Sequence, residues 1–429
     1  MLTANPEPLA PFLDAVLLGD GEELLPIFID NIRAGINLPR AQRLHALAKI
    51  PGIYIPALYM PQYDSEGNLK SVDPITPDIP AKVSKQTWRN SNLACSTVIT
   101  PDAAWPEIYM LEVARGCPEL CRFCLASYSN LPFRAASLQD ALIPAVERGL
   151  AVTKRLGLLG ASVTQHPQFN ELLCWLDKDH FDGTHVSISS VRASTVTPEL
   201  GRILAKRGSK SLTIAIESGS DRIRRLVNKK LEPEEIVAAA HYARDAGLSR
   251  LKIYGMVGLP TEEESDIEAT AELLLRLKKN VKGLHLTLSV STFVPKAHTP
   301  FQWQGVRPEA EKRLKILAKY LKPKGISLRA ESYGWSLIQA LLARSDRRLA
   351  PVIATVRGSQ ESLGGWKRAY RAVRSGEIGT GPDLLPLPPA WEKLVHEDWP
   401  TTSVLPWLHI TGHFGLEILA EQRLRALEL

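Results

Sequence analysis

The sequence predicts an α/β fold whose centre is a parallel sheet. Short β-rich runs alternate with helical runs between residues 107 and 294, and such alternation is typical of parallel strands joined by right-handed crossovers. The composition fits a globular chain, because 45% of the 429 residues are hydrophobic and 23% are charged. An open doubly wound sheet and a curved partial barrel both fit this order. In either fold, chemistry gathers at the carboxyl ends of the strands.

Each predicted element rests on a local pattern. Six β-rich runs are expected to be strands: 107–114, 156–163, 185–191, 211–217, 250–258 and 283–294. Apolar residues spaced by three and four predict the intervening helices: 137–155, 197–208, 232–247 and 261–280. We expect Ser137 to cap the first helix and Gly247 to close the third.

The flanks of this central region have a different character. A Pro-rich extended stretch occupies 51–80, and the chain becomes rich in Trp and Pro after a further helix at 308–322. We therefore expect three parts. They are an N-terminal region (1–100), a core (101–305) and a basic C-terminal region (306–429).

The basic excess lies in the C-terminal region. The net charge is +6, and residues 306–429 hold 19 Lys and Arg against 13 Asp and Glu. The excess is densest over 344–374, where Trp366 and Tyr370 stand among eight basic residues. Such a stretch is typical of a site for RNA or another anionic partner. A solvated helical face has the same composition, and both interpretations stay open.

Several classes of protein are excluded. No apolar run reaches the ~20 residues of a membrane span, and the first residues lack the pattern of a secretory signal. Five cysteines with three of them clustered do not make a disulfide framework. We expect a cytoplasmic protein that has no membrane partner.

Three cysteines fall within "EVARGCPELCRFCLASYSN" (112–130), directly after the first predicted strand. Thiolates at Cys117, Cys121 and Cys124 can converge on one soft metal centre. Structural zinc takes four ligands and cubic iron–sulfur clusters usually take four thiolates, yet the nearest downstream histidine is His166. Three thiolates leave one metal position open for a substrate or cofactor. Zinc completed by a distant residue is the alternative.

The motif "CPELCRFC", with Phe123 before its last cysteine, resembles the signature of the radical S-adenosylmethionine (SAM) enzymes. The resemblance covers roughly residues 107–300. It implies a (β/α)6 partial TIM barrel with smaller appended regions at both ends, and so favours the curved sheet. It also implies a [4Fe–4S] cluster on the three cysteines, with SAM on the fourth iron. Cleavage of SAM then yields a 5′-deoxyadenosyl radical that abstracts hydrogen from a substrate, and an electron donor such as flavodoxin or ferredoxin supplies the electron.

The same resemblance implies SAM contacts at the strand ends. The expected cofactor-binding residues are Phe123, Gly160, Ser162, Arg192, Glu217, Ser218, Val257 and Gly258. In the family a Gly-Gly-Glu type turn grips the SAM amino group, and here no Glu closely follows Gly160. We expect Arg192 either to hold the SAM carboxylate or to form an ordinary ion pair.

The remaining SAM contacts are expected on the later strands. Glu217 and Ser218 are expected at the ribose or amine, and Val257 and Gly258 at the adenine. His298, in "KAHTPF", is expected either as a general acid or base or as a structural residue at a strand end. The same two alternative roles are expected for Tyr128 and Lys296.

The segment "FVPKAHTPFQW" (293–303) resembles the branch that contains methylthiotransferases and cobalamin-dependent radical enzymes. A methylthiotransferase carries a second cluster on three more cysteines, and only Cys95 and Cys174 remain here; we therefore exclude that activity. Residues 5–23 resemble the tail of a cobalamin-binding-like domain, within which we expect the chain to begin. "KDHFDG" (178–183) lacks the Asp that would orient a cobalamin-ligating His, so we expect no cobalamin.

Two other functions are kept as alternatives. One is an iron–sulfur and SAM-binding protein with reduced catalysis, suggested by the absent Glu after Gly160. The other is an RNA-binding protein with a structural metal site.

Overall fold

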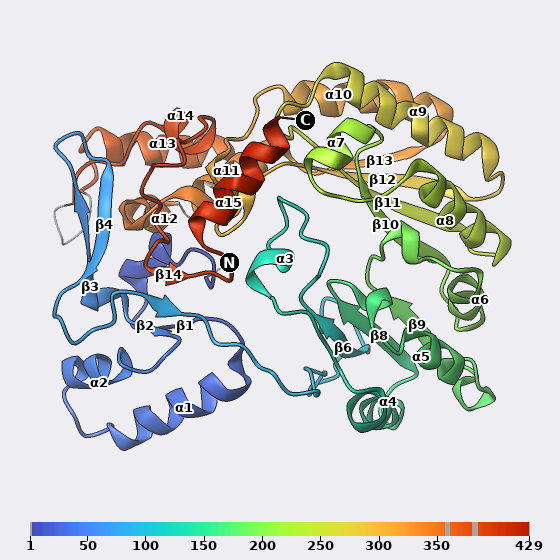
Figure 1. Cartoon of the computed structure of the whole chain (residues 1–429), viewed down its shortest axis with the longest axis horizontal. Coiled ribbons are helices and arrows are strands. Elements are labelled where there is room, and N and C mark those ends of the chain that lie inside the picture. The colour runs from blue at the N-terminus through green and yellow to red at the C-terminus, as the bar shows by residue number, and fades with distance from the viewer. Residues whose placement is uncertain (1, 357–360, 380–384, 429) are drawn as a thin grey trace.

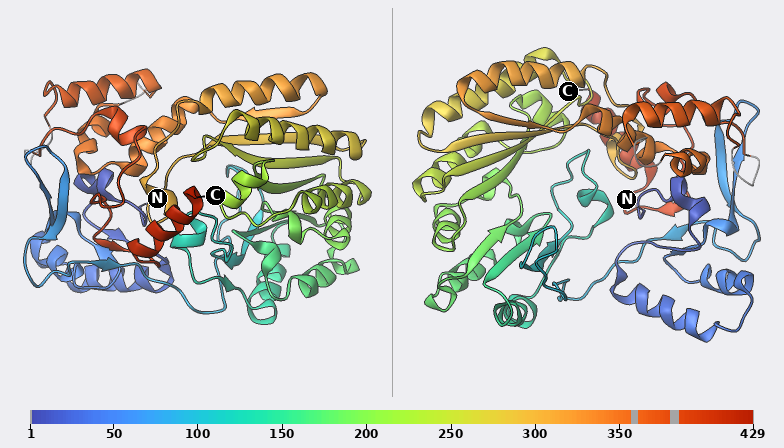
Figure 2. Two further views of the ribbon diagram at one scale, coloured as in Figure 1. Left: turned by 45° about the horizontal axis from the view of Figure 1, so that its top comes forward. Right: turned by 180° about the vertical axis from the view of Figure 1, so that it is seen from behind.

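The computed structural model describes residues 2–356, 361–379 and 385–428. A curved sheet of parallel strands dominates these residues (Figures 1 and 2). In spatial order its strands are β6 (Tyr109–Arg115), β8 (Arg155–Gly160), β9 (His185–Ile188), β10 (Ser211–Glu217), β11 (Arg250–Val257), β12 (His285–Thr292) and β13 (Ser327–Ala330). A single parallel bridge from Val191 to Ile214 joins the two halves, and β7 (Arg134–Ala135) pairs antiparallel with β6. This is the predicted α/β partial barrel.

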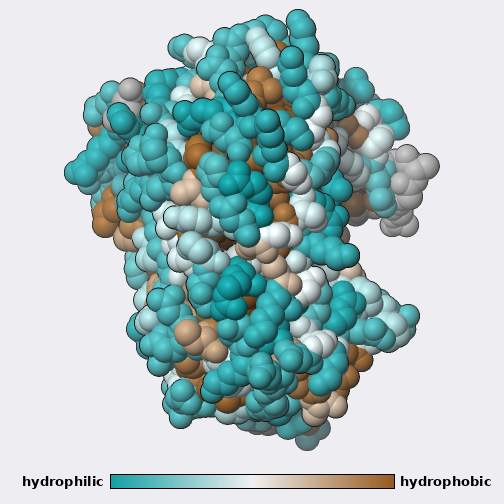
Figure 3. Space-filling model, turned by 90° about the vertical axis from the view of Figure 1, so that its right-hand side faces the viewer, coloured by the Kyte–Doolittle hydropathy of each residue, from teal (hydrophilic) through white to brown (hydrophobic). Residues whose placement is uncertain are grey.

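Helices cover the outer face of this sheet. They are α4 (Ile143–Leu150), α5 (Phe169–Leu176), α6 (Pro198–Lys206), α8 (Pro233–Asp245), α9 (Glu264–Asn280) and α10 (Ala310–Leu321). Their apolar sides pack with the sheet into the largest hydrophobic core of the described residues. The face of the molecule shown in Figure 3 is mostly hydrophilic, as expected for amphipathic helices that turn their polar sides outward.

Side-chain alternation along the strands separates this core from an inner cavity. On β11, Leu251 and Ile253 are buried under the helices, whereas Lys252 and Tyr254 point to the opposite side of the sheet. The inner side chains of β10 to β13 line a cavity of about 470 Å³. The barrel therefore has an apolar exterior under its helices and a polar interior.

Local signals set several element ends. Ser137 caps the first turn by accepting from the Asp140 amide, and Gly247 follows α8 with a φ of 82°. The predicted helix 137–155 is interrupted, because Leu138–Leu142 forms a π-helical turn before α4 begins. Pro144 lies in the first turn of α4, and its missing N–H cannot continue the ladder from that turn.

Some strands end earlier than the sequence predicts. The second stops at Gly160 rather than 163, because Val163–Gln165 forms a 3-10 turn. The third stops at Ile188. Strand β13 was not predicted; it has four residues in the region assigned to the C-terminus, and pairing with β12 stabilises it.

The two flanking regions pack on each other. The N-terminal residues form β1 (Val16–Leu17), α1 (Gly21–Ala34), α2 (Arg40–Leu47), β2 (Ile53–Tyr54), β3 (Tyr59–Tyr63), β4 (Leu69–Pro74) and β5 (Val83–Ser84). The C-terminal residues form α11 (Tyr333–Arg344), α12 (Ala350–Thr355), α13 (Leu363–Arg374), α14 (Trp391–Val395), β14 (Ile410–Thr411) and α15 (Leu416–Leu427). Because β5 and β14 pair in parallel, the flanks share a sheet, although they are far apart in sequence.

The basic stretch 344–374 is largely interior, which corrects the interpretation of its aromatic residues as part of a binding surface. Trp366 and Tyr370 are buried in a hydrophobic core. Three of its basic residues are also buried: Arg344, Arg347 and Arg348. Residues 357–360 lie outside the described residues. The exposed basic residues of α13 are Lys367, Arg368, Arg371 and Arg374, and a role for this basic face in binding an anionic partner stays a prediction.

No helix in the described part of the chain combines the length and apolar character needed to cross a membrane.

Candidate functional site

The cysteine loop connects β6 to α3 (Ala126–Ser129) at the open side of the barrel (Figure 1). Gly116 starts the loop with a φ of 81°, and a side chain there would collide with the Asn130 carbonyl. The Cys124 amide donates to the Cys121 carbonyl over 2.9 Å, which folds the second half of the motif into a turn. The carboxyl end of the first barrel strand thus presents the motif to the barrel mouth.

The three thiols lie in a partly buried setting. Burial raises the pKa of Cys121 to about 12 and also raises the pKa of Cys124. Charge on Cys117 and Cys124 acts on Cys121 as well, so the three sulfurs are close enough to interact. Within the described residues, no three His, Cys, Asp or Glu side chains converge tightly enough to hold a metal ion. The donor set of three thiols on one loop fits an iron–sulfur cluster.

The turn that follows α7 (Asp221–Leu226) braces the cysteine loop. The Asn228 side-chain amide donates to the carbonyls of Glu119 and Leu120, over 3.1 and 2.9 Å. The Cys121 thiol lies 3.7 Å from the Asn228 carbonyl, and Arg122 donates to the Leu226 carbonyl over 2.6 Å. Asn228 has a left-handed φ of 59°, a conformation that Asn tolerates better than most residues. Sequence reasoning did not identify this brace.

Glu119 lies inside the cysteine motif and connects it to two other strand ends. Its carboxylate pairs with Arg192 over 2.9 Å and accepts from the Gln165 amide over 2.6 Å. Ser162 donates to Gln165 through a short hydrogen bond. Arg192 forms an ion pair with Glu119 of the cysteine loop, and its predicted contact with the SAM carboxylate stays a prediction.

A buried ion pair stands beside Cys121. Lys229 donates to the Glu217 carboxylate over 2.8 Å, and each side chain is 10% exposed. Burial lowers the pKa of Lys229, but the Glu217 charge outweighs it and the pKa lies above its ordinary value. Glu217 has a left-handed φ of 65° at the end of β10. Ser218, the next residue, is buried and its hydroxyl lies 3.3 Å from Thr270 of α9.

The predicted adenine edge lies at the end of β11. Val257 is buried, and the Gly258 amide donates to Glu262 over 2.6 Å. A side chain on Gly258 would meet Ala310 of α10 at 2.8 Å. Burial raises the pKa of Glu262 to about 7. Because it accepts from the Gly258 amide, Glu262 fixes the loop after β11. The sequence did not indicate this role.

Two other predicted contacts have clear structural surroundings. Phe123 packs in a small apolar cluster that includes Phe293 and Phe301, so its ring anchors the cysteine loop to the end of β12. Gly160 lines a cavity of about 400 Å³ beside β6, and a side chain there would lie 2.6 Å from the Ala114 carbonyl.

His298 lies in the joint between the barrel and the flanking regions. One ring nitrogen is 3.0 Å from the Ala4 carbonyl, and Gly412 packs against the ring. Burial lowers the pKa of His298 to about 4. Of the two roles predicted for His298, these contacts favour the structural one.

Tyr128 and Lys296 lie in different surroundings. The Tyr128 hydroxyl is buried, 2.7 Å from Gln422 of α15, and so ties α3 to the C-terminal helix. Lys296 follows β12, and burial lowers its pKa to about 8.

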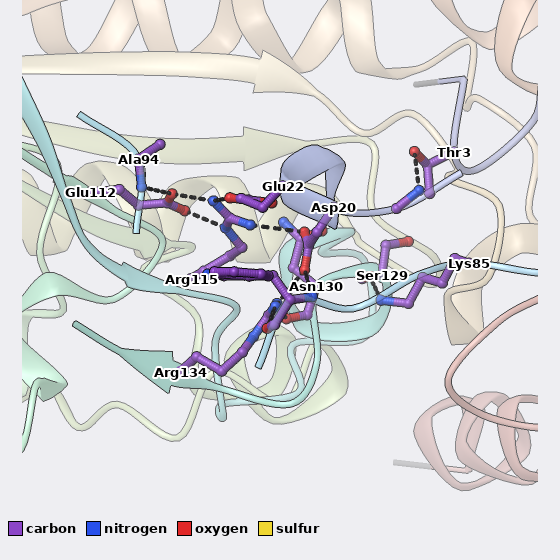
Figure 4. A network of polar contacts seen from close by, with 12 residues as sticks. Thr3, Asp20, Glu22, Lys85, Ala94, Glu112, Arg115, Ser129, Asn130 and Arg134 are labelled. Carbon is purple, nitrogen blue, oxygen red and sulfur yellow. Dashed lines mark hydrogen bonds and ion pairs between the residues drawn. The ribbon is translucent and has the colours of Figure 1, made fainter. Parts of the chain in front are cut away.

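A polar network anchors the N-terminal region immediately before the cysteine loop (Figure 4). Arg115, the last residue of β6, pairs with Asp20, Glu22 and Glu112 at 3.1, 2.7 and 2.6 Å. Arg134 forms a second, short contact with Asp20. Because Asp20 precedes α1, the network fixes that helix to the strand that carries the cysteines.

His180 of "KDHFDG" lies away from this site. It is exposed in a 3-10 turn after α5, 3.2 Å from Glu147 of α4. The motif therefore belongs to the outer helical layer of the barrel.

Comparison with known families agrees with this geometry. Residues 111–274 match the family described as the radical SAM superfamily. Residues 1–56 match the family described as radical SAM proteins, N-terminal. The two matches cover the barrel from β6 into α9 and the region that holds α1 and α2.

The chain is also similar to individual proteins. An uncharacterized protein of Methanocaldococcus jannaschii is 36% identical over 251 residues, which are 58% of this chain and 54% of that protein. A tRNA-2-methylthio-N(6)-dimethylallyladenosine synthase of Anaplasma phagocytophilum is 26% identical over 48% of each chain. This chain thus spans about half the length of these relatives.

Among solved structures, the radical SAM methyltransferase TsrM of Kitasatospora setae is similar in fold. With tryptophan and a SAM analogue bound, it has a TM-score of 0.50 and 13% identity over 70% of this chain and 56% of that chain. A second structure of the same protein holds cobalamin and a [4Fe–4S] cluster. The expected absence of cobalamin from this chain therefore stays a prediction.

Proposed function

Because residues 111–274 form a radical SAM superfamily domain, we propose that the chain is a radical SAM enzyme that holds one [4Fe–4S] cluster on Cys117, Cys121 and Cys124. The observation that carries the proposal is the placement of these three cysteines on one loop at the carboxyl end of β6. When bound, the cluster and SAM supply a radical that abstracts hydrogen from a substrate.

The chain's own residues hold the loop in a fixed orientation. The Asn228 side chain donates to the backbone of the cysteine loop, and Arg192 and Gln165 both contact the Glu119 carboxylate. The Phe123 ring packs in an apolar cluster. Positioning of this kind keeps a reacting centre in one geometry. These contacts come from the ends of β8, β9 and β12 and from the turn after α7, so several parts of the barrel set the direction of the loop.

We propose that SAM lies between the cysteine loop and the ends of β10 and β11. Glu217, Val257 and Gly258 end those strands at the same rim as the cysteines. Lys229 pairs with Glu217 there, and Arg192 pairs with Glu119 of the cysteine loop. The Ser218 hydroxyl contacts Thr270 of α9 and so supports the turn after β10.

The substrate is proposed to enter the inner cavity beside Glu217. The cavity is lined by polar and charged side chains that include Lys252, Ser291 and Arg329. A polar interior of this kind suits a substrate with hydrogen-bonding groups. Reduction requires an electron donor, for which a small flavoprotein or iron–sulfur protein is expected.

Anaerobic reconstitution with iron and sulfide tests the cluster. The wild-type chain is expected to take up about four irons and to absorb near ~400 nm, whereas Cys121→Ala loses both. Cys174→Ala is the matched control, because Cys174 is exposed on α5 and its loss should change nothing. A colourless protein with one zinc per chain would instead support the structural-metal alternative.

One observation favours the second candidate, a cluster protein with reduced catalysis. In the turn after β8, Ser162 is bonded to Gln165, and no Glu closely follows Gly160. Calorimetric titration with SAM separates the two, because tight binding followed by SAM cleavage excludes the second candidate.

A further inference from the structure

Another cavity, partly open to solvent, lies outside the barrel in the module made by the two flanks. It has a volume of about 310 Å³ and is bounded by the β3–β4 hairpin, α11, α14 and residues 402–406. The volume is at the lower end of the range typical of small-molecule sites. Its walls include no residue of the cysteine loop or the barrel strands, so this cavity is separate from the site described above.

Arg344 forms one wall and makes no direct ion pair within the described residues. Its side chain is 1% exposed and donates to the carbonyls of Leu394 and Glu397, over 2.6 and 3.0 Å. It stacks on Trp399 at 3.8 Å. In the described residues it has no carboxylate within 4.0 Å, and its Nε has no hydrogen-bond partner. Burial lowers its pKa to about 9, although the charges of Asp398 and Glu397 act in the opposite direction.

A second cation stands at the rim. Lys393 is exposed and donates to Asn68 Oδ1 over 2.7 Å, again without a carboxylate partner among the described residues. The other charged pair in the wall is self-contained, because Arg348 binds Asp346 through both Nε and Nη2. Two positive charges thus stand without a direct ion pair among the described residues, one deep and one at the rim.

The remaining walls combine apolar surface with a free hydroxyl. Leu69, Pro389 and Val404 line the cavity together with the Trp399 ring. The Ser345 hydroxyl is buried and has no hydrogen-bond partner in the described residues. Buried polar groups without partners are rare in native proteins, and both Arg344 and Ser345 carry one beside this cavity.

We propose that this cavity binds a small organic anion, a carboxylate or phosphate ester with a compact apolar body. The anion would compensate Arg344 and Lys393, and the apolar body would lie against Trp399 and the prolines. Charge-assisted hydrogen bonds from arginine and lysine are the usual means of holding such groups. The site is independent of the proposed function, because it uses none of the same residues.

Calorimetric titration of the full chain tests the proposal with three probes: benzoate, phenyl phosphate and benzyl alcohol. At least one anion should bind with a dissociation constant of about 1 mM or lower, and the neutral alcohol should bind at least about tenfold more weakly. The tighter of the two anions identifies the acidic group.

Two variants locate the binding. Lys393→Glu should weaken binding of that anion at least about tenfold, whereas Lys324→Glu, an equal charge reversal at an exposed position after α10, should leave it unchanged. Arg344→Lys keeps the charge but shortens the side chain, and should also weaken binding. The proposal is overturned if neither anion binds, if the alcohol binds equally well, or if Lys393→Glu and Lys324→Glu behave alike.

Discussion

Lys229 and Glu217 form an ion pair in which each side chain is 10% exposed, next to Cys121. A pair of this kind contributes little net stability, yet breaking it leaves one charge buried without compensation. The ion pair instead orients the chain, because it holds the turn that carries Asn228 against the end of β10. The Lys229–Glu217 pair therefore fixes the position of the cysteine loop relative to the proposed SAM site.

Replacing one partner of this pair should be more harmful than replacing both. Lys229→Met is expected to lower the free energy of unfolding by about 3 kcal/mol, because Glu217 stays buried and unpaired. The double variant Lys229→Met with Glu217→Gln should recover most of that loss. Urea unfolding of the protein without cluster measures both, and equal destabilisation by the single and double variants would contradict the pairing.

His298 should make stability depend on pH. Its folded pKa of about 4 lies below the ordinary 6.5, so the unfolded chain binds more protons between these values. The contribution of the neutral ring is fully present above pH 6.5 and is lost as the pH falls toward 4. His298→Asn should remove this part of the pH dependence and leave SAM cleavage intact. A variant that unfolds normally but has lost cleavage would restore His298 as a catalytic residue.

At the scale of elements, the turn after α7 supports the loop after β6. The contacts join backbone to backbone and side chain to backbone, so they depend on the shape of both turns. Leu120 and Asn228 both have a left-handed backbone, with φ of 54° and 59°. The two loops therefore hold one another in conformations that neither would favour alone.

Asn228→Ala should loosen this brace. It removes two hydrogen bonds and adds strain at a positive φ, whereas Asn228→Gly removes only the bonds. Reconstituted protein should lose iron to a chelator fastest in Asn228→Ala, more slowly in Asn228→Gly and slowest in the wild type. Equal rates in all three proteins would show that the turn does not support the cysteines.

The sequence predicts some of these features and not others, for physical reasons. The cysteine spacing, the Ser137 cap and the barrel strands are visible because each depends on neighbouring residues. The brace joins residues that are about a hundred positions apart, such as Asn228 and Glu119, so no local pattern encodes it. Strand β13 was missed because four residues carry too weak an alternation, and only pairing with β12 defines it.

At the scale of the whole molecule, residues of the N-terminal and C-terminal flanking regions contact each other. Glu7 is buried and pairs with Arg347 at 2.9 Å, while its carboxylate also approaches His409 at 3.5 Å. A short hydrogen bond from Tyr54 completes the cluster. Together with the pairing of β5 and β14, this cluster makes the two flanks one module beside the barrel (Figure 2).

Glu7 should be important for this module. Glu7→Gln leaves Arg347 buried without its counter-charge, and we expect a loss of about 3 kcal/mol in unfolding free energy. Asp14→Asn is a matched control, since Asp14 pairs with Arg40 on the surface and should contribute less than about 1 kcal/mol. Thermal unfolding compares the two variants, and equal small effects would mean that the cluster does not hold the flanks together.

The most direct measurement is SAM cleavage by the reconstituted protein. After reduction with dithionite under anaerobic conditions, the wild-type chain should convert SAM to methionine and 5′-deoxyadenosine, which chromatography detects. Cys121→Ala should form none above background, and Cys174→Ala should match the wild type. If the wild-type protein holds four irons and binds SAM but forms no more 5′-deoxyadenosine than Cys121→Ala, the chain is not a radical SAM enzyme.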